Sequence, residues 1–187
     1  WSTAPMAAGA TVHNFDIDLA DADRQVYETL ALRLARHPSE SAEFLMTRVL
    51  AYALEFETGI AFSTGGLSDP AEPAISVRDL TGALRSWIEI GSPDAARLHK
   101  AAKASPRVAV YTHKDAERLA QRLSGERIHR ADAVELHAID PALVAGLASR
   151  LDRRMAFTLS VSDRELFISI GAVTLTGSVV RRPIVQA

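Results

Sequence analysis

Residues 77–91 read VRDLTGALRSWIEIG, and they predict a β-hairpin at the centre of the chain. Apolar residues dominate positions 74–77 and 86–90, and the segment between them contains Gly82, which favours a turn. Glu89 stands between Ile88 and Ile90, where burying a carboxylate without a partner is costly. Asp79 ends the first strand. Because the strands of a hairpin lie side by side, we expect the carboxylates of Asp79 and Glu89 to approach each other.

The segments before the hairpin predict two strands and a helix. Apolar residues alternate at 10–19 and 26–34, which is typical of an antiparallel strand pair. Pro38 stops the second strand, and Ser39 is a suitable N-cap for an amphipathic helix that continues to about Glu57. Glu40 and Glu43 then fall in the first turn, where the helix dipole favours acidic groups. A short strand is expected at residues 60–62.

The segments after the hairpin alternate between helices and strands. We expect helices at residues 94–104, 114–123 and 141–151, and strands at residues 108–111 and 134–139. This alternation predicts parallel strand pairing with crossover helices. Residues 155–185 return to β structure, with a turn at Asp163-Arg164 and interruptions at Gly171 and Gly177. The sequence therefore predicts an α/β fold with a mixed β-sheet, flanking helices, an antiparallel N-terminal strand pair and a β-rich C-terminal region.

The composition limits the classes of protein to consider. A length of 187 residues favours one domain, which we expect to span residues 10–187. The chain has no cysteine, which excludes disulfides, thiolate zinc sites and thiol catalysis. No apolar run reaches the ~20 residues that span a bilayer, and no signal peptide is recognisable. We therefore expect a cytoplasmic protein that is not a membrane protein.

The ends of the chain and its charge add two expectations. Because Met6 is a plausible natural start, we expect residues 1–9 to be an expression remnant and a disordered N-terminus. The net charge of −2 is unlike that of proteins that coat nucleic acid, so a nucleic-acid partner needs a local basic patch. Arginines at positions 150, 153, 154, 181 and 182 are candidates for such a patch, although each is also explained as a solvated surface residue.

The paired carboxylates suggest a metal site. Asp79 and Glu89 together could hold one Mg²⁺, which prefers oxygen ligands and keeps several waters. Such an ion polarises a phosphate and lowers the pKa of a bound water. The alternative is that Glu89 faces solvent or pairs with an arginine.

Three segments resemble one known family. Residues 34–40 (LARHPSE), residues 87–94 (WIEIGSPD) and the spacing of Arg97, Lys100 and Ala101 resemble the YaeQ family of bacterial proteins, and the likeness extends from Ala10 to the end of the chain. The resemblance implies a compact variant of the PD-(D/E)XK nuclease-like fold, with a restriction-endonuclease-like core. The biochemical role of the family is poorly defined.

The resemblance also implies site residues. Asp79 is similar to the aspartate of the nuclease motif, Glu89 to its acidic partner and Glu40 to a glutamate on the first core helix. The motif places a lysine two residues after the acid, but this chain has Gly91 there. Lys100 on the following helix is the best substitute, and we expect its ammonium to point toward Glu89.

Some of these assignments have competitors. Lys103 and Arg97 could take the role of Lys100, and Glu72 competes with Asp79 as the second carboxylate. Glu40 could serve only the helix dipole.

Three functions are compatible with these residues. The first is a Mg²⁺-dependent phosphodiesterase acting on nucleic acid, with Glu40, Asp79, Glu89 and Lys100 as catalytic residues and Asp79 and Glu89 as metal ligands. The second is a binding or regulatory protein that keeps a nuclease-like scaffold without turnover, which Gly91 and the acidic net charge favour. The third is an interaction module without metal, which docks through its C-terminal β region. Fold alone does not choose among them.

Overall fold

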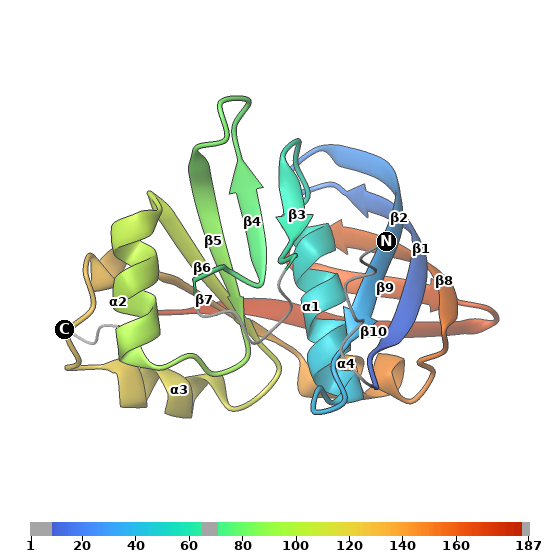
Figure 1. Cartoon of the computed structure of the whole chain (residues 1–187). Coiled ribbons are helices and arrows are strands. Elements are labelled where there is room, and N and C mark those ends of the chain that lie inside the picture. The colour runs from blue at the N-terminus through green and yellow to red at the C-terminus, as the bar shows by residue number, and fades with distance from the viewer. Residues whose placement is uncertain (1–8, 65–70, 185–187) are drawn as a thin grey trace.

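The computed structural model describes residues 9–64 and 71–184, which form a ten-stranded mixed β-sheet and four α-helices (Figure 1). All but one of the first nine residues, the expected N-terminal remnant, lie outside the described residues. Among the described residues, no helix is both long and apolar enough to cross a bilayer. The predicted α/β class is confirmed.

One continuous sheet has the strand order β2-β1-β8-β9-β10-β7-β6-β5-β4-β3. Its strands are β1 (Thr11–Asp21), β2 (Val26–Arg36), β3 (Ile60–Phe62), β4 (Ile75–Arg78), β5 (Leu84–Ile90), β6 (Arg107–Thr112), β7 (Glu135–Ile139), β8 (Arg154–Ser162), β9 (Glu165–Ile170) and β10 (Val173–Arg182). The helices are α1 (Ala42–Leu54), α2 (Ala95–Ala104), α3 (Ala116–Leu123) and α4 (Pro141–Ala148), with a 3-10 turn at Ala131–Ala133.

The sheet has two halves that meet at β10. In one half, β1 pairs with β2 antiparallel and with β8 parallel, which confirms the predicted N-terminal strand pair. In the other half, β5, β6 and β7 pair in parallel, as the alternation of strands and helices predicts. Residues 173–178 of β10 pair with β9, and residues 179–182 of the same strand pair with β7. The sheet therefore curls into a nearly closed, barrel-like shape around α1 (Figure 1).

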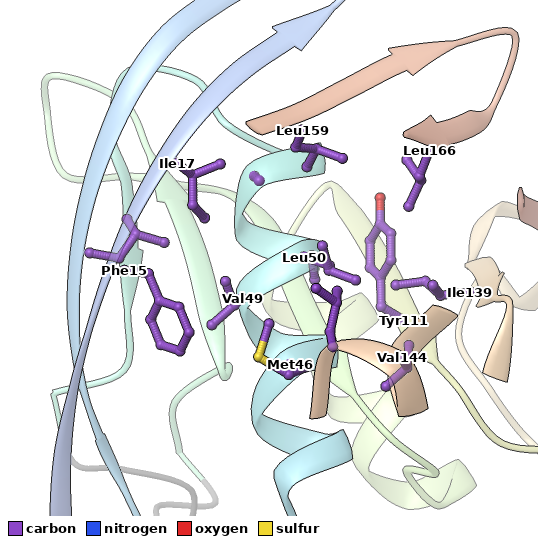
Figure 2. Close-up of a cluster of buried hydrophobic side chains, with 14 of the residues drawn as sticks. Phe15, Ile17, Met46, Val49, Leu50, Tyr111, Ile139, Val144, Leu159 and Leu166 are labelled. Carbon is purple, nitrogen blue, oxygen red and sulfur yellow. The ribbon is translucent and has the colours of Figure 1, made fainter. Parts of the chain in front are cut away.

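The main core surrounds α1. Met46, Val49 and Leu50 of this helix are fully buried, because the curled sheet supplies apolar side chains on several sides of the helix. Figure 2 shows Phe15 of β1 beside one side of α1 and Tyr111 of β6 beside another. A second cluster lies between the other face of the β5–β7 sheet and helices α2 and α3, and includes Trp87, Leu98 and Leu119. The two clusters show that β5 to β7 are covered on both faces.

Three local predictions are wrong. Ser41, not Ser39, caps α1, because its side chain accepts a hydrogen bond from Phe44 N at 3.0 Å. The main chain closes a turn before the helix, where Glu40 N donates to His37 O at 2.9 Å, so Glu40 precedes the helix. Gly177 does not interrupt the last strand and lies inside β10.

Candidate functional site

Asp79 lies in the tight turn that joins β4 and β5. Its Oδ1 accepts hydrogen bonds from Thr81 Oγ1 at 2.5 Å, Thr81 N at 2.9 Å and Ala83 N at 3.0 Å. The hydrogen bond from the Thr81 side chain is the largest influence on the pKa of Asp79, which lies below its ordinary value. The carboxylate is exposed and holds the turn together.

Glu89 lies at the opposite end of this hairpin. Asp79 N bonds to Ala83 O at the turn, whereas Ile75 pairs with Ile88 at the other end of the hairpin. Glu89 lies six residues after Ala83 along the extended chain. At about 3.3 Å per residue this is a separation of roughly 20 Å. The prediction that Asp79 and Glu89 approach each other across the hairpin is wrong, because the turn encloses Asp79 and leaves Glu89 near the far end of the strand.

Glu89 is buried and both of its oxygens have protein partners. Trp87 Nε1 donates to Oε1 at 2.5 Å, and Arg97 Nε forms an ion pair with Oε2 at 2.8 Å. The guanidinium of Arg97 also lies over the Trp87 ring, 5.8 Å from its centroid. A buried carboxylate is tolerated when it is paired and hydrogen-bonded. Pairing with an arginine, the alternative that the sequence leaves open, is therefore what the structure has.

Arg97 also links Glu89 to Glu72. Its Nη2 donates to the main-chain oxygen of Glu72 at 2.9 Å, and the Glu72 carboxylate accepts from Ser63 Oγ at 2.8 Å. Glu72, the competitor of Asp79, thus lies at the Glu89 end of the hairpin. Lys100 is exposed on α2, and Arg97 takes the position beside Glu89 that the sequence assigns to Lys100. Lys103 is exposed in the last turn of the same helix.

Glu40 belongs to the other face of the sheet. Ile88 and Ile90 pack in the cluster around α1, whereas Trp87 packs with α2. Since side chains alternate along a strand, Glu89 faces α2. Glu40 is buried against α1, where its Oε1 accepts from Arg48 Nη2 at 3.1 Å and from His37 N at 3.2 Å. Burial raises the pKa of Glu40, and the charge of Arg48 only partly opposes this.

The three predicted carboxylates therefore lie in separate places. Asp79 is in a turn, Glu40 is on the α1 face of the sheet, and Glu89 is on the α2 face, the face covered by the helix that carries Lys100. Among the residues that the structure describes, no three His, Asp or Glu side chains are grouped so that they could hold a metal ion. The prediction that Glu40, Asp79 and Glu89 share one concave site is wrong.

A partly buried ionic network on the α1 face was not predicted. Arg107, at the start of β6, contacts Glu55 through Nη1 at 2.7 Å and through Nη2 at 2.9 Å, and contacts Glu135 through Nε at 2.8 Å. Tyr111 Oη donates to Glu55 at 2.6 Å. These partners come from the C-cap of α1, from β6 and from β7, so no short sequence motif marks them. We call Glu55, Arg107, Tyr111, Glu135 and His137 the Arg107 network.

The hydrogen bonds of this network set the donor and acceptor roles of the His137 ring nitrogens. Arg164 Nη2 lies 2.9 Å from His137 Nδ1, and an arginine can only donate, so Nδ1 is an acceptor. The neutral His137 ring then carries its hydrogen on Nε2 and donates it to Glu135 Oε1 at 3.0 Å. Burial opposes ionisation of Glu135, but the hydrogen bonds from His137 and Arg107 lower its pKa to about 2. The network thus links the C-terminal end of α1 to strands β6 and β7.

A basic hollow lies beside α3. Its volume is about 560 Å³, and the residues that line it are Ser92, Lys114, Asp115, Arg118, Leu119 and Arg122. We call it the α3 groove. Arg118 and Arg122 lie four residues apart on one side of α3, and Lys114 precedes its N-cap, Asp115. The four-residue spacing of these three cations is a signal in the sequence that could have identified them.

Comparison with known proteins supplies the family. The family model described as YaeQ protein matches residues 6–178. The chain belongs to the YaeQ family. It is 30% identical over 165 residues to "Uncharacterized protein YaeQ" of Salmonella typhi, and 28% identical over 165 residues to the protein of the same name from Escherichia coli (strain K12). Each match covers 88% of this chain and 91% of the relative.

Two crystal structures of YaeQ proteins share the fold. The protein from Pseudomonas syringae superposes with a TM-score of 0.83 at 27% identity, covering 94% of this chain and 97% of that one. The protein from Xanthomonas axonopodis pv. citri superposes with a TM-score of 0.77 at 28% identity, covering 92% of this chain and 98% of that one. This chain therefore shares its curved mixed sheet with these two YaeQ proteins.

Proposed function

We propose that this protein binds nucleic acid without cleaving it, on a scaffold that keeps a nuclease-like core. The observation that carries this proposal is the state of Glu89, whose two oxygens are held by Trp87 at 2.5 Å and Arg97 at 2.8 Å. A Mg²⁺ ion needs open carboxylate oxygens at short distance. In this site an arginine already neutralises the one buried carboxylate.

The proposed core is the segment α1-β3-β4-β5-α2-β6, a helix followed by three antiparallel strands, a helix and a parallel strand. In this segment α1 takes the place of the first core helix, and the β4–β5 hairpin takes the place of the acidic motif. Three departures from an active site support loss of turnover. Gly91 stands at the lysine position, Asp79 lies at the far end of the hairpin, and Glu40 packs on the opposite face of the sheet.

Metal titration and a cleavage assay test this proposal together. We expect no heat of binding for Mg²⁺ or Mn²⁺ in calorimetry, and no cleavage of single- or double-stranded DNA or RNA with either ion. Asp79→Asn is the matched control, because its carboxylate is exposed and lies far from Glu89. Metal binding that survives in Asp79→Asn and disappears in Glu89→Gln, in a protein whose circular dichroism is unchanged, would contradict the proposal.

A metal-dependent phosphodiesterase is the second candidate, and one observation favours it. Arg97 forms an ion pair with the Glu89 carboxylate and donates to the main-chain oxygen of Glu72, so one cation contacts both residues at this end of the hairpin. In this reading Glu72 replaces Asp79, Arg97 holds the position of a Mg²⁺ ion in the metal-free protein, and Lys100 supplies the missing cation near the phosphate. Arg97→Gln should then increase the affinity for Mn²⁺. Unchanged or absent Mn²⁺ binding in this variant excludes the second candidate.

A further inference from the structure

The α3 groove is built mainly from cations. Lys114, Arg118 and Arg122 supply three positive charges, and Asp115 supplies one negative charge. The Asp115 carboxylate is engaged as the N-cap of α3, where its Oδ1 accepts from Arg118 N at 3.0 Å. In the described part of the chain, no carboxylate forms an ion pair with any of the three cations. The groove therefore carries an excess of positive charge that its own residues do not neutralise.

One of these cations is held in place. Arg122 Nη2 donates to Pro93 O at 3.0 Å and to Ser92 O at 3.4 Å, which ties α3 to the loop between β5 and α2. An arginine fixed in this way loses less side-chain freedom when it meets an anion. Lys114 and Arg118 are exposed and can move toward a ligand.

Two of the cations lie on α3, and Lys114 lies just before its N-cap, Asp115. Arg118 and Arg122 are four residues apart, which is about 6 Å along a helix axis, and Lys114 continues the row on the N-terminal side of the helix. Strand phosphates of a duplex follow one another every ~3.4 Å along the axis. A row of this length fits several phosphates of one chain better than a single phosphate group.

A second hollow, next to the α3 groove, carries more negative than positive charges. It shares Lys114 and Asp115 with the α3 groove, and Glu117, Asp140 and Arg182 also line it. Its three carboxylates outnumber its two cations, so a polyanion is favoured only along the α3 groove. Among the described residues that line the α3 groove none is aromatic, which leaves no platform for stacking bases.

We infer that the α3 groove binds the sugar-phosphate backbone of a nucleic acid through Lys114, Arg118 and Arg122. This inference rests on the proposed function and assigns a binding site to it. The site uses three cations and does not include Glu89. Contacts of this kind position a nucleic acid without reading its sequence, and their affinity falls as salt rises. The groove lies where the parallel strands β5 and β6 end, which is the edge where open α/β sheets bind ligands.

Fluorescence anisotropy with a labelled single-stranded DNA and with its duplex tests the site. The dissociation constant is measured over a series of salt concentrations for the full chain and for Lys114→Gln and Arg118→Gln. Each lost phosphate contact should lower the slope of log K against log salt by about 0.7 for the single strand or about 0.9 for the duplex. The double variant should lose about twice as much.

Arg33→Gln on β2 is the matched control, since it removes the same charge from an exposed site in the other half of the sheet (Figure 1). If the control weakens binding as much as Arg118→Gln does, or if neither groove variant changes the slope, the groove is not the site, although binding by the protein stands. If the unaltered chain binds neither DNA, the proposed function and the site both fail. Displacement of bound DNA by inorganic pyrophosphate at equal phosphate concentration would show a small-phosphate site and overturn the polyanion assignment.

Discussion

Glu40 and Arg48 form an ion pair where neither side chain meets solvent, with 0% and 4% side-chain exposure. Arg48 Nη2 donates to Glu40 Oε1 and also to Ala35 O at 3.0 Å. No described residue bonds to Glu40 Oε2 or to Arg48 Nε. Pairs of this kind add little net stability, but the loss of one partner leaves a buried charge and is expensive.

Arg48→Met should therefore lower the free energy of unfolding by about 3–5 kcal/mol near neutral pH. Burial already raises the pKa of Glu40. A raised carboxyl pKa means that the contribution of Glu40 to stability is present below pH 4.5. This contribution is lost as the pH rises through the pKa of Glu40 in the folded protein. The loss in Arg48→Met should accordingly shrink when urea unfolding is repeated at lower pH. The double variant Glu40→Gln/Arg48→Met should recover most of the stability. Failure to recover it would show that Arg48 acts through its contact with Phe62, whose ring centroid lies 5.8 Å from the guanidinium carbon.

The pKa of Glu135 is shifted in the opposite direction, below its ordinary value. Its pKa lies near 2 in the folded protein against an ordinary 4.5, so its contribution is present above 4.5 and is lost as pH falls toward 2. At 1.36 kcal/mol per pKa unit, Glu135→Gln should reduce stability at neutral pH by up to about 3 kcal/mol. Urea unfolding as a function of pH measures this, with the exposed Glu28→Gln as control. A difference between Glu135→Gln and the unaltered chain that stays constant down to about pH 3 would contradict the ion-pair account.

At the scale of elements, the sequence predicts most of the strands and helices because their signals are local. Alternating apolar residues locate β1 and β2 within two residues at each end, and helices α2 and α3 begin within two residues of the predicted positions. The start of α1 is displaced from Ser39 to Ser41 because a main-chain turn at His37 competes with capping. The site could not be predicted as well, because the position of Asp79 depends on hairpin register and the Arg107 network joins residues 52 and 28 positions apart.

The end of β5 gives a prediction at this scale. Gly91 has φ of +94°, and a Cβ there would lie 3.0 Å from Phe44 Cε2 on α1. Gly91→Ala should destabilise the fold by about 1–2 kcal/mol through backbone strain, plus a further loss from the contact with Phe44. Gly125→Ala is the control, because Gly125 has φ of +82° with open space around its Cβ position. Equal losses of unfolding free energy in the two variants would show that α1 does not press against the end of β5.

At the scale of the whole molecule, β10 joins the two halves of the sheet. It passes from β9 to β7 at residues 178 and 179, while α4 packs across it with Leu143 buried. Gly177 lies at this crossing, and a Cβ there would come within 2.8 Å of Leu143 Cβ and 2.9 Å of Asp140 Cβ. The sequence predicts that Gly177 interrupts the last strand. In the structure, the absence of a side chain at Gly177 allows the start of α4 to pack closely against β10.

Gly177→Ala should consequently destabilise both halves together. Overpacking of this kind costs about 1–3 kcal/mol. In a Trp1→Phe background the fluorescence of Trp87 reports the core beneath α2, whereas far-ultraviolet circular dichroism reports the whole sheet. Because one continuous ladder of strands connects the halves, the two signals should give the same urea midpoint, and Gly177→Ala should lower both midpoints equally. Gly171→Ala, in the turn between β9 and β10 with open space around its Cβ position, should change them less. A Trp87 midpoint that stays fixed while the circular dichroism midpoint falls would mean that the β5–β7 half keeps its fold when the β1–β9 half is lost, and that β10 connects two units that unfold separately.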